Sequence, residues 1–196
     1  MADPADKDNS GAYGDFYFHV GHCVKVWAVV EQHLFDLCHI YSGSSRTVAA
    51  VIYGRTPTLE ARISLISDLI ETAYPKKPGE HDHPNVITWD KIKAESKRLI
   101  PTRNVIVHAP AAMQAKLNLE VLPDLQVDTW VELYAAEHDK LRGKGTGPLK
   151  IEQVKQHRAD ATDLAKQISS FVNFLRPPKR RRRRFRQGPA IPNRKQ

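Results

Sequence analysis

The sequence predicts an all-α protein: an up-and-down bundle of four or five helices with a small β-hairpin-like insertion before the last helix. Three observations lead to this prediction. Apolar residues recur at gaps of three and four over most of the chain, capping residues or prolines bound these segments, and only one short stretch alternates apolar with polar residues. We expect a flexible N-terminus over residues 1–14, one helical domain over residues 15–175 and a disordered basic tail over residues 176–196.

The first half of the domain contains three predicted helices. The first covers residues 15–41, with an apolar stripe that includes Trp27, and the Ser-Gly-Ser-Ser run at residues 42–45 ends it. Ser45 can cap a short helix that stops at Gly54. A third helix follows over residues 58–73. Its polar residues lie outside the apolar stripe, as expected for a helix with one buried face.

A proline-rich loop over residues 75–84 separates the third helix from the fourth. Asn85 can cap this fourth helix, which Ala109-Pro110 ends. Pro101 removes one backbone donor from it, so it should kink the helix or restart it.

The strand pair and the last helix complete the predicted domain. Residues 113–122 alternate apolar and polar, and residues 127–133 do so more loosely, so we expect an irregular strand pair. A glycine-rich turn at 143–148 leads into a final helix over residues 150–175. Two consecutive prolines at 177–178 end that helix.

The charge of the chain is concentrated at its C-terminus. The 196 residues carry 30 basic and 22 acidic side chains, a formal net charge of +8. Ten of the basic residues and none of the acidic ones lie in residues 176–196, so residues 1–175 have a net charge of −2. This distribution excludes a uniformly basic fold such as a small ribosomal protein, and it makes the tail the predicted nucleic-acid-binding segment.

The tail should bind phosphates through counterion release, with strong salt dependence and little sequence preference. A nuclear-localisation signal and a terminus that only improves solubility are the other interpretations of the same residues. The predicted nucleic-acid-binding residues are Lys179, Arg180, Arg181, Arg182, Arg183, Arg184 and Arg186.

One segment near the end of the fourth helix combines residues suited to phosphate chemistry. Arg103 and His108 enclose four residues, and the polar Asn104 follows the arginine. Asn104 and His108 are four residues apart and share a helix face, and the long Arg103 side chain can reach the same cleft. An arginine can stabilise a phosphorane dianion, and a histidine can transfer protons near neutral pH.

This segment resembles the Arg-x(4–6)-His motif of the HEPN superfamily, whose members are helical bundles and commonly have a polar residue after the arginine. The order of the helices over residues 15–175 is similar as well, with Trp27 and Glu31 in the first. The resemblance implies a metal-independent endoribonuclease without a cofactor. In it, the ribose 2′-OH attacks the adjacent phosphate to leave a 2′,3′-cyclic phosphate.

The resemblance also implies roles for individual residues. His108 is the expected general base or acid, Arg103 stabilises the charge on the phosphoryl oxygens, and Asn104 orients His108 or a phosphate oxygen. HEPN ribonucleases are usually homodimers in which two motifs face one shared cleft. A toxin or an RNA-cleaving defence effector is the biological role such an activity suggests, with any neutralising partner unknown.

Two other interpretations of the motif stay open. The pair can bind RNA without cleaving it, in a non-catalytic nucleic-acid-binding or dimerisation module. Alternatively, Arg103 and His108 only cap carbonyls at a helix end and pack against Glu31 or another acid. Glu31 is expected either to support Arg103 through an ion pair or to be solvated.

The sequence gives no indication of a metal site, a cofactor or a membrane span. His19, His22 and Cys23 would have to converge with Cys38 and His39 to bind zinc, but the two groups are about 22 Å apart along one helix. The His-Asp-His run at residues 81–83 lacks companions at metal-ligand spacing. No apolar run approaches the roughly 20 residues of a membrane helix, and the polar N-terminus does not resemble a secretory signal. A cytoplasmic protein with two buried, reduced cysteines is therefore the prediction.

Overall fold

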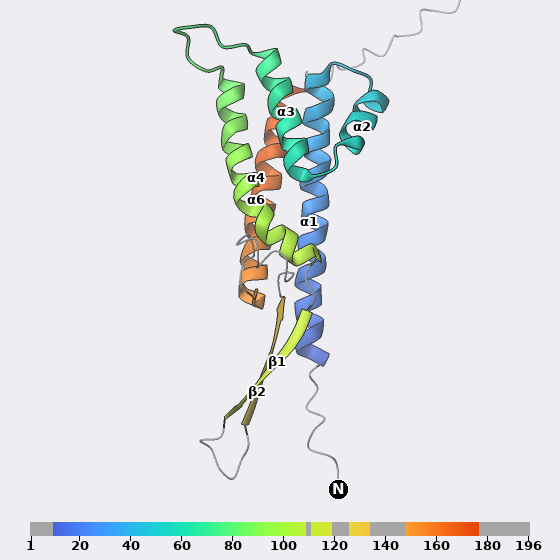
Figure 1. The fold of residues 1–196 in the computed structure, drawn as a ribbon, viewed down its shortest axis with the longest axis vertical. Coiled ribbons are helices and arrows are strands. Elements are labelled where there is room, and N and C mark those ends of the chain that lie inside the picture. Colours follow the sequence, from blue (N-terminus) through green and yellow to red (C-terminus); the bar gives the residue numbers. More distant parts are fainter. Residues whose placement is uncertain (1–9, 109–110, 119–125, 134–147, 177–196) are drawn as a thin grey trace, which may run out of the picture.

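The computed structural model describes residues 10–108, 111–118, 126–133 and 148–176, which form five helices and one pair of strands. The helices form an elongated bundle, and the strands project from one end of it (Figure 1). The prediction of an all-α bundle with a small hairpin is confirmed within these residues. In chain order, the elements are α1 (Ser10–Ser42), α2 (Arg46–Arg55), α3 (Leu59–Ala73), α4 (Pro84–His108), β1 (Ala111–Asn118), β2 (Gln126–Leu133) and α6 (Ile151–Leu175).

Helix α1 is the longest element and packs against α2, α3, α4 and α6. It begins at Ser10, so residues 10–14, which the sequence analysis assigned to a flexible N-terminus, are helical. It ends where predicted, and Gly43 after it adopts a positive φ of 61°, a conformation that glycine adopts without strain. Residues 1–9 and the predicted basic tail from residue 177 onward lie outside the described residues.

The predicted cap at Ser45 is confirmed, Thr58 caps the third helix instead of being its first residue, and one predicted helix end is wrong. The hydroxyl of Ser45 accepts a hydrogen bond from the amide of Val48, and that of Thr58 accepts one from the amide of Ala61. Helix α2 continues through Gly54 to Arg55. Gly54 lacks the positive φ that ends a helix, and glycine inside a helix costs only about 1 kcal/mol.

Helix α4 begins at Pro84, one residue before the predicted cap. Asn85 is therefore not a cap but a buried residue of the first turn, and its side-chain amide donates a hydrogen bond of 2.8 Å to the Tyr74 hydroxyl. Proline suits this position because its fixed φ is helical and its missing N–H has no partner in a first turn. Helix α4 continues through Pro101, and its last part turns toward α1 (Figure 1), as expected when a proline removes a backbone donor inside a helix. Residues 109–110, the predicted end, lie outside the described residues.

Two hydrophobic cores lie along the bundle. The larger is built from α1, α2, α3, α4 and α6 and includes Trp27, Leu34, Ile66 and Trp89. The smaller joins the start of α1, the end of α4, β2 and the start of α6. Leu99 and Ile100 of α4 belong to the first core, whereas Val105 and Ile106 belong to the second. The bend at Pro101 thus lies where α4 passes from one core to the other.

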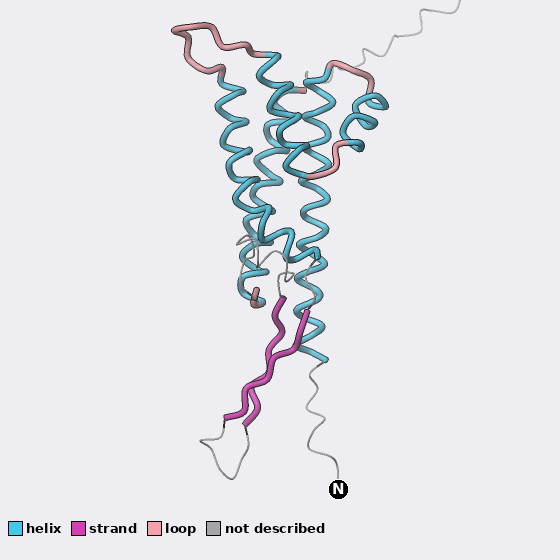
Figure 2. Tube along the Cα trace, in the orientation of Figure 1, coloured by secondary structure: helices cyan, strands magenta, loops and turns pink. Residues whose placement is uncertain are grey.

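The strands β1 and β2 form an antiparallel pair that runs from Ala111↔Leu133 to Asn118↔Gln126 (Figure 2). The predicted pair is confirmed, but the first strand begins two residues earlier than expected, and residues 119–122 lie outside the described residues. Leu133 also pairs with Leu149, just before α6. Of the predicted turn at 143–148, only residue 148 is among the described residues.

Candidate functional site

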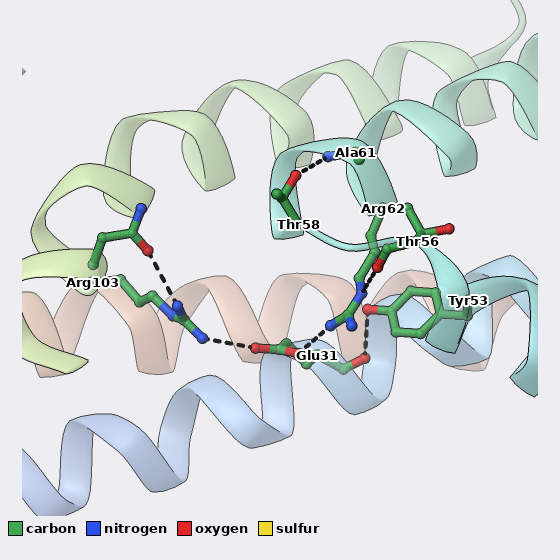
Figure 3. A network of polar contacts seen from close by, with 8 residues as sticks. Glu31, Tyr53, Thr56, Thr58, Ala61, Arg62 and Arg103 are labelled. Atoms are coloured by element: carbon green, nitrogen blue, oxygen red, sulfur yellow. Dashed lines mark hydrogen bonds and ion pairs between the residues drawn. The ribbon is translucent and has the colours of Figure 1, made fainter. Parts of the chain in front are cut away.

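Arg103 follows the Pro101 bend and reaches from α4 to α1. Its Nη2 donates a hydrogen bond of 3.1 Å to Oε1 of Glu31, and its Nη1 donates one of 3.2 Å to Oδ1 of Asn104 (Figure 3). The side chain is 20% exposed, and its buried Nε has no partner among the described residues. The ion pair between Glu31 and Arg103, one of two interpretations left open by the sequence, is therefore present.

Glu31 also binds a second arginine, Arg62 of α3. Oε2 of Glu31 accepts a hydrogen bond of 2.7 Å from Nη1 of Arg62, so each carboxylate oxygen receives one guanidinium (Figure 3). Arg62 makes two further contacts. Its Nε donates to the carbonyl of Thr56 over 3.1 Å, and its guanidinium lies 4.8 Å from the centre of the Tyr53 ring. The Tyr53 hydroxyl in turn donates to the backbone carbonyl of Glu31 over 3.2 Å.

The Glu31–Arg103 pair lies in a groove of about 500 Å³ between α1, α2 and the end of α4. Val24 of α1 is 45% exposed and lines this groove instead of a core. The walls are mostly apolar, and the charged lining residues that the structure describes are Glu31 and Arg103. The complete lining is Val24, Trp27, Ala28, Glu31, Gln32, Phe35, Ala50, Tyr53, Gly54, Arg103 and Val107.

His108 is the last residue of α4 and does not line the groove. Its side chain is exposed and makes no hydrogen bond or ion pair with any described residue. Asn104 is exposed as well and lies one turn before His108 on the same helix face. In the structure, Arg103 contacts both Asn104 and Glu31. His108 lies apart from these contacts, at the C-terminal end of α4.

The predicted nucleic-acid-binding residues Lys179 to Arg186 lie outside the described residues, but the start of the tail is defined. Nη2 of Arg176 donates a hydrogen bond of 2.8 Å to Oδ2 of Asp36, a buried carboxylate of α1. Oδ1 of Asp36 accepts from Arg46 over 3.2 Å and from Gln32, a groove residue, over 3.4 Å. Arg176, the first residue of the predicted tail, therefore shares the Asp36 carboxylate with Gln32 of the groove.

Two histidines whose burial the sequence analysis missed lie between α1 and α6. His157 is buried beside Trp27, and burial lowers its pKa to about 4. Burial, the largest effect, and the nearby Arg158 also lower the pKa of His19, whereas Asp15 opposes this change. Arg62 was likewise missed as a site residue, because its spacing marks only a polar helix face and its partner lies on another helix.

The cysteines and histidines of α1 have structural surroundings. Cys23 and Cys38 are buried free thiols, as predicted, and burial raises the pKa of Cys23 to about 11. Across the described ranges, no group of three or more His, Cys, Asp or Glu side chains is arranged to hold a metal ion. None of the helices in the same part of the chain combines the length and the apolar character that a membrane span requires.

Comparisons with protein-family models, with curated proteins and with solved structures gave no match to this chain. The functional argument therefore depends on the contacts of the groove and of the last turns of α4.

Proposed function

We propose that this protein is a metal-independent endoribonuclease of the HEPN type. The observation that carries the proposal is the hydrogen bond from Arg103 to Asn104, because it couples a groove-lining guanidinium to the helix face on which His108 is exposed. A cation for the phosphoryl oxygens and an accessible imidazole thus occupy one helix end.

In the proposed reaction, His108 accepts the proton of the ribose 2′-OH as it attacks the adjacent phosphorus, or protonates the 5′-oxygen that leaves. Arg103 stabilises the charge on the non-bridging oxygens, and Asn104 orients His108 or a phosphate oxygen. The products are a 2′,3′-cyclic phosphate and a free 5′-OH. No atom of this scheme requires a metal ion.

A homodimer with a shared cleft fits this chemistry better than a single chain. Base and acid must act on opposite sides of the phosphorus, and His108 lies outside the groove of its own chain. A second copy would bring a second His108. The mostly apolar walls of the groove, including the exposed Val24, offer surface for such a contact.

A second candidate function is a non-catalytic RNA-binding or dimerisation module with a basic arm. The specific observation in its favour is the ion pair of Arg103 with Glu31, which partly neutralises the guanidinium that catalysis would use. In this alternative, the tail supplies RNA affinity and the bundle only dimerises.

The two functions are separated by incubating the purified full-length protein with single-stranded RNA in EDTA and determining the ends of the products. We expect cleavage that leaves 2′,3′-cyclic phosphates. RNA that is bound but stays intact over a range of protein concentrations would support the binding module instead. Cleavage that EDTA abolishes would overturn the proposed mechanism.

A further inference from the structure

Two guanidinium groups from different helices converge on one carboxylate at the groove. Arg62 of α3 and Arg103 of α4 each donate to a separate oxygen of Glu31, over 2.7 and 3.1 Å. All three side chains are partly exposed, at 22% for Arg62, 27% for Glu31 and 20% for Arg103. The pair of oxygens that Glu31 presents is similar to the two non-bridging oxygens of a phosphodiester, for which arginine is equally suited.

The charges around this carboxylate do not cancel. Arg62 and Arg103 supply two positive charges and Glu31 one negative charge. Arg62 reaches Glu31 from outside the groove lining, and the described lining residues other than Glu31 and Arg103 are uncharged. The Arg103 guanidinium also retains an unused donor, because its Nε has no hydrogen-bond partner among the described residues. An additional anion would remove both the excess charge and the unmet hydrogen-bonding capacity.

The surroundings of the charged cluster favour a nucleic-acid phosphate over a small inorganic anion. Phe35 and Tyr53 line the same groove with ring centroids 5.7 Å apart, and Val107 adds apolar surface. Aromatic and apolar walls beside an arginine pair suit a base and a ribose that flank a phosphate. Arg176, the first residue of the predicted basic tail, also binds Asp36, the carboxylate that accepts a hydrogen bond from Gln32 of the groove.

We infer that Arg62 and Arg103 together form a binding site for one RNA phosphodiester, and that Glu31 occupies the place of this phosphate in the free protein. Binding displaces the Glu31 carboxylate from one or both guanidinium groups. Arg62 is then a phosphate-binding residue, and Glu31 sets the affinity by competing with the ligand. This inference rests on the proposed function for its choice of RNA as the ligand.

The test uses the full-length protein and a dinucleotide with a single phosphodiester and a 2′-O-methyl group, which cannot be cleaved by 2′-OH attack. Because the ligand has only one phosphate, the contribution of the tail is small and equal in all variants. Binding is followed by tryptophan fluorescence, because Trp27 lines the groove. We expect Glu31→Gln to bind roughly fivefold more tightly and Arg62→Gln roughly fivefold more weakly than the wild type.

Arg98 and Glu95 supply matched controls. Arg98 also binds two carboxylates, but its partners Glu95 and Asp160 do not line the groove, whereas Arg62 binds Glu31, which does. Arg98→Gln and Glu95→Gln should leave the affinity for the dinucleotide unchanged. Equal affinity of Arg62→Gln and Arg98→Gln would overturn the inference and leave the Glu31 cluster a structural ion pair. This comparison decides the matter even if Glu31→Gln does not fold, which circular dichroism would reveal.

The result is separable from the outcome for the proposed function. Weaker dinucleotide binding by Arg62→Gln, in a protein that never cleaves RNA, would support the phosphate site and contradict the ribonuclease. Cleavage with unchanged KM and kcat in Arg62→Gln would support the ribonuclease and contradict the phosphate site.

Discussion

The indole nitrogen of Trp27 donates a hydrogen bond of 3.0 Å to Nε2 of His157, and the two rings are stacked with their centroids 5.9 Å apart. Both residues are buried, at 2% and 4% exposure, where α1 packs against α6. A nitrogen that accepts a hydrogen bond cannot carry a proton, so this contact requires the neutral form of His157.

The Trp27–His157 contact predicts a loss of stability in acid. The folded-state pKa of His157 is about 4, mainly because of burial, whereas an unfolded histidine has a pKa near 6.5. The stabilisation is therefore complete above pH 6.5 and is lost as the pH falls from 6.5 towards 4, by up to about 3 kcal/mol. Urea unfolding at pH 7 and at pH 4.5 measures this change.

The matched variant for this prediction is His157→Gln, whose amide oxygen can accept from Trp27 but does not titrate. Its free energy of unfolding should depend less on pH over this range. Some dependence should remain, since the pKa of His19 is lowered as well. Identical pH profiles for the variant and the wild type would show that His157 is not the titrating group.

Asp36 is predicted to stabilise the bundle through its two arginine partners. Its buried carboxylate accepts from Arg46, at the start of α2, and from Arg176, just after α6. Asp36→Asn should lower the free energy of unfolding by about 1–3 kcal/mol, since two charge-assisted hydrogen bonds are weakened. The control Asp163→Asn removes an exposed carboxylate with one lysine partner, and it should change stability by less than about 0.5 kcal/mol. Similar losses in both variants would contradict this role for Asp36.

His108→Ala is predicted to abolish cleavage without affecting folding. The side chain is exposed and makes no hydrogen bond or ion pair with a described residue, so the melting temperature should not change. The cleavage rate should fall at least about 100-fold if His108 transfers protons. His81→Ala, an exposed histidine in the loop before α4, is the control. A His108→Ala protein that cleaves at the wild-type rate would remove His108 from the mechanism.

Deletion of residues 177–196 is predicted to weaken RNA binding and its dependence on salt. The deletion removes nine basic residues, each able to neutralise one phosphate and change the slope of log K against log salt by about 0.7 for a single strand. Deletion of only residues 187–196 removes two of the nine and should have a small effect. An unchanged slope after the longer deletion would show that the tail does not contact RNA.

The sequence predicted the bundle well because local signals define its helices. Ser45 and Thr58 are caps within their own segments, and apolar residues at gaps of three and four identify the buried faces of α1 and α6. The errors arose where tertiary contacts determine the role of a residue. Asn85 was expected to cap a helix, but its side chain binds Tyr74 across a loop, a contact that sequence spacing does not reveal.

The site was predictable only in part for the same reason. Arg103, Asn104 and Glu31 could be proposed from spacing and from a family resemblance, and their mutual contacts are present. Arg62 could not be found in this way, because a polar residue on α3 gives no sign that it meets a carboxylate of α1. The placement of His108 outside the groove depends on the rotation of the last turn of α4, which a spacing rule does not specify.

The ion pair between Arg176 and Asp36 attaches the first residue of the basic tail to α1, at a carboxylate that also accepts a hydrogen bond from Gln32 of the groove. Covalent geometry limits the following twenty residues to about 70 Å from that point in any conformation. One RNA molecule held within a sphere of this radius has an effective concentration of about 1 mM. A groove that binds a single phosphodiester with only millimolar affinity would therefore be substantially occupied once the tail has captured the strand.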